Sequence, residues 1–337
     1  MRLSVFATLA SLALCHAGYH EGFTNDWSFD LKSDEYPDWM SKLVDDVPLS
    51  LLSIPGTHNS LSYKFADLHL QGQNIPLQDQ LTAGIRYIDV SCHTKGDDLL
   101  VYHGLSSTDI LFQDVMKALF NFLDRHPGET VILRIQKHNL LEPSDDFVRT
   151  LRKYLKPSIG SDDRLATRIF SNGRDGITDI PTLGEVRGKV FILQDFKTRV
   201  PGRYGLPWSS PEVSVFDFKV ALKKFFLGMR WHFIREFIVD IKNNPKLFIT
   251  HTTASAGAKP VEVAIGSTSH EGMNTRLGKF LEGSHDVNTL PIIDRVGIIA
   301  MDYPGMNLVH EILKFNIQHC ASPPGPSRIP HTVAESA

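Results

Sequence analysis

The chain has 337 residues, of which 42% are hydrophobic and 22% charged, as in an ordinary globular protein. Its formal net charge of −3 at pH 7 argues against a nucleic-acid partner, which a basic surface would attract. The length is large for a single core, unless the fold is a closed α/β barrel, which commonly takes about 250 residues or more.

The N-terminus predicts a secretory signal peptide over residues 1–17. Met1 and Arg2 give a positive start, residues 3–14 form an apolar run, and Ala17 supplies a small residue for cleavage. The run is shorter than the ~20 apolar residues that span a bilayer, and no later stretch is long and apolar enough. We therefore expect a soluble, secreted protein.

Two cysteines are left once the signal peptide, with Cys15, is removed. An oxidising compartment would allow Cys92 and Cys320 to form a disulfide. In a barrel, however, Cys92 ends an early strand, whereas Cys320 follows the last helix and lies near the opposite face. Because pairing depends on geometry, the bridge is the less favoured alternative.

The rest of the chain alternates between strand and helix patterns. Apolar runs predict strands at residues 50–54, 87–92, 99–102, 130–135, 189–193, 246–250 and 296–301, with a weak one at 168–170. Helical periodicity marks residues 38–46, 110–125, 144–155, 212–242, 274–281 and 306–318. About eight strands in such an alternation predict an α/β fold closed into a barrel. We expect one domain over 18–320 and a disordered Pro-rich tail over 321–337.

Two of these strands are each followed by a histidine. Residues 52–60 read LSIPGTHNS and place His58 just after a Pro-Gly break, and residues 99–104 read LLVYHG and place His103 at a strand end. Between them, residues 84–92 read GIRYIDVSC and supply Asp89. Polar residues at the carboxyl ends of strands carry the chemistry of α/β barrels. Two histidines with an acid between them suit paired acid–base catalysis.

These motifs, taken in order, resemble the bacterial-type phosphatidylinositol-specific phospholipases C. Trp39-Met40 precedes the first of them, and residues 129–133 (ETVIL), 187–193 (RGKVFIL) and 299–303 (IAMDY) continue the match toward Phe315. The resemblance implies an irregular (β/α)8 barrel, the phospholipase C-like phosphodiesterase type, that cleaves phosphatidylinositol into diacylglycerol and a cyclic inositol phosphate.

The resemblance also implies roles for individual residues. His58 is expected to be the general base on the inositol 2-hydroxyl, and His103 the general acid on the diacylglycerol oxygen. Asp302 is expected to orient the base histidine, and Asp89 to lie near the phosphate beside the second histidine or a metal. The remaining histidines, such as His93, His138 and His251, are interpreted as surface or supporting groups because they show no metal-ligand spacing.

Two patterns within the resemblance are incomplete. Metal-independent members carry an arginine where this chain has Ser91. Calcium-dependent members carry an asparagine and three acids, of which only Asn59 and Asp89 are present, since Ser91 and Gln136 replace the other two. Calcium prefers six to eight oxygen ligands with several carboxylates. No cofactor is therefore expected, with Ca²⁺ held by Asn59 and Asp89 as the alternative.

An arginine on a neighbouring strand offers a replacement for the missing positive charge. Arg134 precedes Gln136 by two residues, so both side chains should point to the same face of the strand. Arg134 then either binds phosphate oxygens, together with Gln136, or pairs with a carboxylate deeper in the barrel; both readings stay open. Asp217 corresponds, by resemblance, to an inositol-binding acid.

The implied substrate lies in a membrane, so a peripheral membrane contact is expected. Residues 223–226 (KKFF) and 229–233 (MRWHF) combine basic and aromatic side chains, although such a stripe more often packs against its own fold. Trp39 and Trp208 are the other candidate rim contacts. The expected partner is phosphatidylinositol or a glycosyl-phosphatidylinositol lipid, bound by a monomer.

Three functions follow. The first is a secreted phosphatidylinositol phospholipase C. The second is a barrel with impaired catalysis that still binds inositol lipids, which Ser91 and Gln136 favour. The third is a phosphodiesterase on another headgroup, such as a glycosyl-phosphatidylinositol anchor.

Overall fold

A computed structural model describes residues 26–138, 145–155, 167–172, 176–198, 203–217, 227–254, 258–267, 270–284 and 293–321. The predicted signal peptide, all of the predicted tail except Ala321, and residues 223–226 lie outside the described residues. The boundaries proposed for a single domain over 18–320 stay a prediction.

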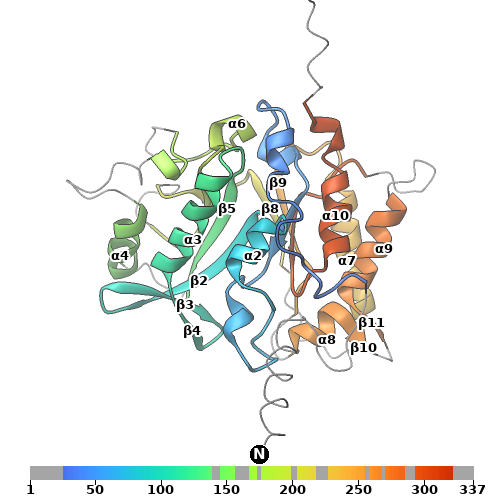
Figure 1. Cartoon of the computed structure of the whole chain (residues 1–337), viewed down its shortest axis with the longest axis horizontal. Coiled ribbons are helices and arrows are strands. Elements are labelled where there is room, and N and C mark those ends of the chain that lie inside the picture. Colours follow the sequence, from blue (N-terminus) through green and yellow to red (C-terminus); the bar gives the residue numbers. More distant parts are fainter. Residues whose placement is uncertain are drawn as a thin grey trace, which may run out of the picture.

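Eight parallel strands form a curved, barrel-like sheet at the centre of the structure (Figure 1). The strands are β1 (Ile54–Thr57), β2 (Tyr87–Lys95), β5 (Val131–Lys137), β6 (Val190–Asp195), β7 (Leu206–Pro207), β8 (Val213–Phe216), β9 (Leu247–His251) and β12 (Ile298–Met301). Their order is β7-β6-β5-β2-β1-β12-β9-β8, so the first strand lies between the second and the last. Among the described residues, β7 and β8 form no ladder with each other, and the barrel is irregular, as expected.

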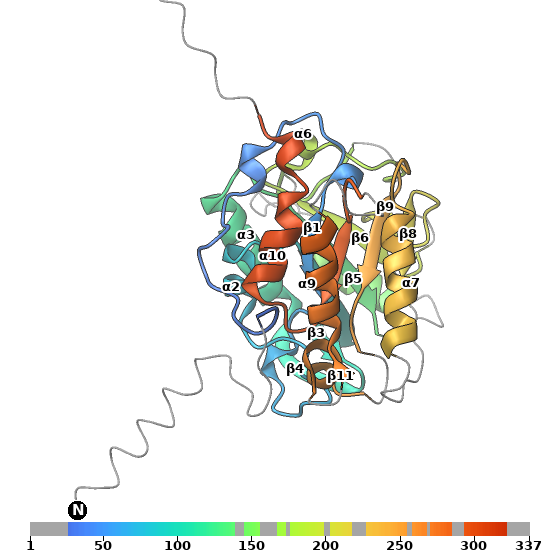
Figure 2. The ribbon, with the colours of Figure 1, turned by 90° about the vertical axis from the view of Figure 1, so that its right-hand side faces the viewer.

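Helices cover the outside of this curved sheet. They are α2 (Leu77–Thr82), α3 (Phe112–Arg125), α4 (Asp145–Leu155), α6 (Leu183–Val186), α7 (Leu227–Val239), α8 (Pro260–Ile265), α9 (Met273–Ser284) and α10 (Met306–Lys314). Figure 2 shows α10, α9 and α7 side by side over one flank of the barrel. Within the described part of the chain, no helix combines the length and apolar character needed to cross a membrane.

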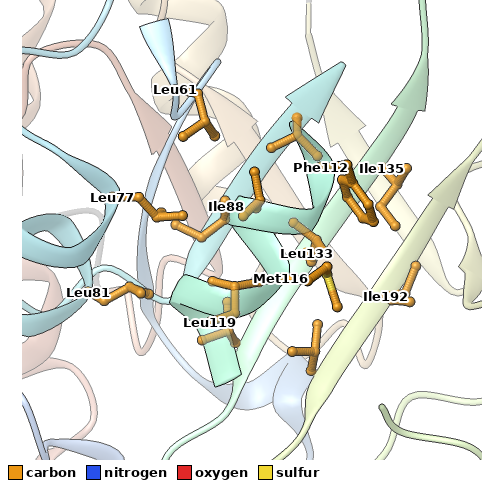
Figure 3. Packing of buried hydrophobic residues seen from close by; sticks show 14 of the residues in the cluster. Leu61, Leu77, Leu81, Ile88, Phe112, Met116, Leu119, Leu133, Ile135 and Ile192 are labelled. Carbon is orange, nitrogen blue, oxygen red and sulfur yellow. The ribbon is translucent and has the colours of Figure 1, made fainter. Parts of the chain in front are cut away.

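Side-chain alternation along each strand divides the protein into an outer core and a barrel interior. Ile88, Leu133 and Ile192 point outward and pack against Phe112 and Met116 of α3 (Figure 3). The residues that alternate with them on the same strands, such as Ile132 and Phe191, point inward and belong to the interior cluster. The interior is apolar toward the start of the strands, whereas charged residues follow toward their carboxyl ends.

An antiparallel extension replaces one expected barrel strand. Residues 99–102, predicted as a strand of the parallel sheet, belong to β3 (Asp98–His103), which pairs antiparallel with β2 and with β4 (Ser106–Leu111). The reason is that β2 continues beyond the barrel, where its edge is open to the returning chain. The extension lies at the same end of the molecule as α8 and the short strands β10 (Gly266–Ser267) and β11 (His270–Glu271) (Figure 1).

The first strand begins later than predicted. Residues 49–51 form a 3-10 helix, and β1 starts at Ile54, so Pro55 and Gly56 lie inside the strand instead of ending it. The glycine is required by packing, because a Cβ at Gly56 would lie 2.7 Å from the Cβ of Tyr87 on β2. The prediction of a strand over 50–54 was therefore only partly right.

Three other expectations also need correction. The helix predicted over 212–242 divides into β8, which hydrogen-bonds to the edge of β9, and α7. The helix predicted over 38–46 is reduced to a 3-10 turn at Met40–Lys42. The weak strand at 168–170 contributes one isolated bridge between Ile169 and Val190.

Both described cysteines are free thiols. Cys92 is buried in the outer core and Cys320 is exposed. The two cysteines form no disulfide in the structure, as the sequence favoured.

A fully buried ion pair ties the N-terminal segment to the barrel. Arg86 Nη2 lies 2.8 Å from Glu129 Oε2, and both side chains are inaccessible to solvent. Arg86 also donates to the carbonyl oxygens of Leu81, Ile85 and Pro37, while Glu129 accepts from the backbone amides of Met40 and Ser41. Each charge is therefore compensated, which a buried pair requires.

We expect Glu129→Ala to destabilise the protein by about 3–5 kcal/mol, because it leaves the Arg86 charge buried without its counter-charge. Urea denaturation followed by circular dichroism measures the change. Glu282→Ala, at an exposed glutamate of α9, serves as the control and should keep the wild-type midpoint. Equal midpoints for the two variants would contradict this role of the pair.

Candidate active site

A cavity of about 450 Å³ opens at the carboxyl ends of the barrel strands. Seven of the eight predicted site residues line it: His58, Asn59, Asp89, His103, Arg134, Gln136 and Asp302. The eighth, Asp217, follows β8 and is not among the lining residues, but its charge contributes to raising the pKa of His58. The structure therefore brings together side chains from five separate stretches of the chain.

His58 and Asp302 meet because β1 and β12 are adjacent and in register. Thr57 pairs with Met301, so the next residue of each strand stands at the cavity floor. His58 Nδ1 donates a hydrogen bond to Asp302 Oδ1 over 3.1 Å, and the Asn59 side-chain amide donates to His58 Nε2 over 2.9 Å. Asn59 has a positive φ of 43°, a left-handed conformation that asparagine tolerates better than most residues.

His103 stands opposite His58 across the cavity. Its ring centroid lies 6.1 Å from that of His58, and the two rings are nearly perpendicular. His103 Nδ1 donates to the carbonyl oxygen of Leu70 over 2.6 Å, which assigns the proton to Nδ1 in the neutral ring and leaves Nε2 as the other titrating nitrogen. Both histidines are thus held at Nδ1 by an acceptor.

The two histidines are shifted in opposite directions. Burial would lower the pKa of His58, but the charge and hydrogen bond of Asp302, together with the charges of Asp89 and Asp217, outweigh it, so the pKa of His58 is raised. Burial lowers the pKa of His103, and the neighbouring His58 lowers it further. In the unliganded protein His58 consequently keeps its proton to higher pH than His103 does.

Arg134 is held among three side chains on the barrel interior. Its Nη2 lies 2.6 Å from Asp195 Oδ2, its Nη1 lies 3.3 Å from Asp89 Oδ2, and its guanidinium stacks 3.9 Å from the ring of Trp208. Burial disfavours its charge, but Asp89 and Asp195 help to outweigh that effect, so the pKa of Arg134 is raised and the side chain stays cationic. Arg134 therefore both pairs with carboxylates and lines the cavity, so the two readings of this residue are not exclusive.

Gln136 lies one layer closer to the opening. Its side-chain amide donates to Asp195 Oδ2 over 3.2 Å, so Arg134 and Gln136 converge on one carboxylate oxygen. The prediction that both residues face the barrel interior is borne out by this shared partner. Ser91 also lines the cavity, in register with Gln136.

Two residues of this region were missed from the sequence, because Asp195 and Trp208 were not connected with Arg134. His251 was interpreted as a surface or supporting group, and its position agrees with the second alternative: it is fully buried at the end of β9, with its ring 5.6 Å from that of His58. Asp195 and His251 each follow a predicted strand within two residues, so the signal that selected His58 and His103 would have found them too.

The other two histidines in that interpretation are more peripheral. His93 is exposed, as expected, whereas His138 lines the cavity. Their rings lie 5.9 Å apart. Neither contacts the pair formed by His58 and Asp302.

The predicted membrane contacts are only partly supported. Trp39 is buried and donates its indole N–H to the Gly84 carbonyl, so it is not a rim residue. On α7, Arg230 is buried, Trp231 packs against the core, and only Met229 and Phe233 expose large apolar surfaces, at 53% and 45%. Packing against the barrel, the favoured interpretation of this stripe, accounts for most of its described part.

Comparison with known proteins identifies relatives over nearly the whole chain. Residues 46–195 match the family model "Phosphatidylinositol-specific phospholipase C, X domain". The chain is 28% identical to the 1-phosphatidylinositol phosphodiesterase of Listeria monocytogenes, over 87% of this chain and 89% of that protein. It is 21% identical to the enzyme of the same name from Staphylococcus aureus, over 90% and 96% of the two chains.

Solved structures give the same picture. The phosphatidylinositol-specific phospholipase C from Listeria monocytogenes superposes with a TM-score of 0.68 at 26% identity, covering 83% of this chain and 98% of that one. A Staphylococcus aureus phosphatidylinositol-specific phospholipase C superposes with a TM-score of 0.64 at 17% identity, over 83% and 97% of the chains, which supports the fold alone. The resemblance and the irregular (β/α)8 barrel are thus confirmed. The chain is similar to bacterial phosphatidylinositol-specific phospholipases C over most of its length, and residues 46–195 match the model of their X domain.

Proposed function

We propose that this protein is a phosphatidylinositol-specific phospholipase C that works by two-histidine acid–base catalysis. The relatives at 28% and 21% identity are named 1-phosphatidylinositol phosphodiesterases. The observation that carries the proposal is the pair of histidine rings 6.1 Å apart at one cavity, one of them hydrogen-bonded to Asp302. That spacing allows both imidazoles to reach one phosphodiester.

Each residue then has a defined task. His58 removes the proton of the inositol 2-hydroxyl as its oxygen attacks phosphorus, and His103 protonates the diacylglycerol oxygen as that bond breaks. The products are diacylglycerol and a cyclic inositol phosphate. Asp302 orients His58 and stabilises the imidazolium that forms. Arg134 faces the charge that develops on the phosphoryl oxygens, where fixed donors lower the barrier most.

The opposed pKa shifts bear on this mechanism. A general base must start neutral and a general acid protonated, whereas the unliganded protein favours a proton on His58 over one on His103. A bound phosphodiester carries a negative charge, which raises the pKa of a nearby imidazole. Substrate binding therefore favours protonation of His103, while the 2-hydroxyl must find His58 deprotonated. His58 and His103 therefore titrate as a coupled pair, so that the protonation state of one affects the pKa of the other.

The donor set does not fit calcium. Asn59 and Asp89 are the only members of the calcium pattern present at this cavity, and Asp89 already accepts from Arg134. A calcium site needs six to eight oxygens with several carboxylates. We assign the charge compensation at phosphorus to Arg134 and include no metal in the mechanism.

One observation favours a second candidate, an inositol-lipid-binding barrel with impaired turnover. Arg134 uses three of its five N–H donors on Asp195 and Asp89, which leaves two for a phosphate. Turnover measurements separate this candidate from the enzyme. Glycosyl-phosphatidylinositol is an alternative substrate that turnover measurements of this kind also test. It shares the inositol phosphate group that the cavity residues would bind.

The proposed setting is extracellular, with peripheral contact to a membrane. Residues 1–17 have the pattern of a signal peptide. Leu105 is 92% exposed next to Gly104, which lines the cavity, so an apolar side chain stands at the opening where a lipid would enter. A monomeric state stays a prediction.

The function is tested with purified protein and phosphatidylinositol vesicles, with products identified by phosphorus NMR. We expect wild-type protein to release a cyclic inositol phosphate. His58→Ala and His103→Ala should each lower turnover by about 10²- to 10⁴-fold, because each removes a proton-transfer group. Asp302→Asn should lose less than His58→Ala, since it orients the base. Vesicle binding without turnover in the wild type would support the lipid-binding candidate instead.

The His58–Asp302 interaction can be tested by titration. Asp302→Asn removes the charge that raises the pKa of His58, while burial still lowers it, so the imidazole should lose its proton at lower pH than in wild type. NMR of labelled histidine, with the resonance assigned through His58→Gln, measures both curves. The exposed His232 of α7 is the internal reference. Superimposable His58 curves in the two proteins would remove Asp302 from its assigned role.

The role of Arg134 is tested together with metal dependence. Arg134→Ala should lower turnover by about 10²-fold or more, as for the loss of one transition-state donor. Arg134→Lys should recover only part, since an ammonium cannot contact two phosphate oxygens in one plane. Arg149→Ala, at an exposed arginine of α4, should be neutral. A chelator should leave turnover unchanged. Loss of activity with chelator, restored by calcium, together with an active Arg134→Ala, would refute the assignment.

A further inference from the structure

Two imidazoles and a carboxylate converge beside the cavity, where His58 and Asp89 line it and His251 lies buried next to His58. One ligand atom from each of His58, Asp89 and His251 lies within 4.8 Å of the others. His58 follows β1, Asp89 lies within β2, and His251, the last residue of β9, is fully buried. We infer that the three form a binding site for a transition-metal dication such as Zn²⁺, and that occupancy of this site turns the enzyme off.

The ligand chemistry selects this class of metal. Two imidazoles with one carboxylate are ligands of zinc and similar transition ions, whereas calcium takes oxygen. His58 Nδ1 is held by Asp302, so its lone pair is on Nε2, where it accepts from Asn59. A neutral imidazole at His251 likewise carries one nitrogen lone pair. A carboxylate behind a ligating histidine, as Asp302 is here, is the usual support of such a ligand.

The geometry requires a modest closure. Zinc binds nitrogen at about 2.0–2.1 Å, so tetrahedral ligand atoms lie roughly 3.4 Å apart. The distances between the three ligand atoms must therefore shorten by up to about 1.4 Å, and the Asn59 amide must give up its hydrogen bond to His58. The open side of the cavity leaves the fourth position to water.

The charge balance favours a cation in spite of Arg134. That guanidinium lies 3.3 Å from Asp89 and opposes a metal there. Asp302 contacts His58, Asp195 pairs with Arg134 and offsets its charge, and Asp217 acts on His58 from the end of β8. Arg230 is the other guanidinium nearby, with its Nη2 at 3.4 Å from the His251 carbonyl. Four carboxylates thus outnumber two guanidinium groups around two neutral imidazoles.

The consequence for catalysis rests on the proposed function. A metal on His58 Nε2 occupies the lone pair that would accept the proton of the 2-hydroxyl. The metal-bound protein is therefore inactive, and removal of the ion restores it. Binding of the ion itself does not depend on any catalytic activity, so the two statements can be tested separately.

The experiment uses untagged protein in phosphate-free buffer, with Co²⁺ as a visible probe and Zn²⁺ in calorimetry. We expect one equivalent to bind, with Co²⁺ bands typical of low coordination number. His251→Gln should weaken metal binding by about 10-fold or more. Loss of a residue that only supports a metal ligand already costs about that much, and loss of a ligand itself should cost at least as much. Asp89→Asn is the second ligand variant, in case the buried His251→Gln fails to fold. His232→Gln, at the exposed histidine of α7, is the matched control and should bind like wild type.

Each outcome has one meaning. No binding up to millimolar metal, or equal affinity in wild type and the folded ligand variants, overturns the site. Zinc should abolish release of cyclic inositol phosphate by wild type, with full recovery on adding a chelator. Turnover that persists at saturating zinc overturns the inhibitory role. Metal binding that depends on His251, in a protein that shows no turnover even when metal-free, confirms the site and refutes the proposed enzyme.

Discussion

The parallel pairing of the first barrel strand with the last one positions most of this site. β1 lies between β12 and β2, and the His58 amide donates to the Met301 carbonyl. Residues 244 positions apart in the chain therefore become neighbours at the cavity floor. Gln73 reinforces the junction, because its side-chain amide donates to the carbonyl oxygens of both His58 and Met301. Without this closure, His58 would lack the carboxylate that keeps it oriented.

The barrel interior changes from apolar to charged along the strand direction. Its lower layers contain side chains such as Ile132 and Leu193, which anchor the strands as a hydrophobic core does. The upper layers contain Asp89, Arg134 and Asp195, which would be costly to bury without mutual compensation. The same ion pairs therefore make a charged cavity tolerable and hold a guanidinium rigidly beside it. A rigid donor loses little free energy on meeting a developing charge, which is the basis of electrostatic catalysis.

Several features of the site could be predicted from local pattern. A histidine after an apolar run located His58 and His103, and alternation with a period of two placed Arg134 and Gln136 on one face. The contacts of Arg134 with its partners could not be predicted in this way. Asp195 and Trp208 follow different strands, and their contact with Arg134 depends on strand order and register, which no local pattern contains. The same limit applies to β8. Its residues were predicted to be part of a helix, and only the pairing with β9 in the folded protein shows that they form a strand.

The sequence by itself determined the fold class, the motif order and the identity of the residues able to transfer protons, because these depend on side-chain type and short-range periodicity. The tertiary structure alone decided which carboxylate meets which cation and where each histidine lies. It shifted the pKa values of His58 and His103 in opposite directions, and it decided between the surface and supporting alternatives for His251 by burying this residue beside His58. The physical reason is that burial and charge interactions act through space over a few ångströms, between residues that barrel closure brings from distant parts of the chain.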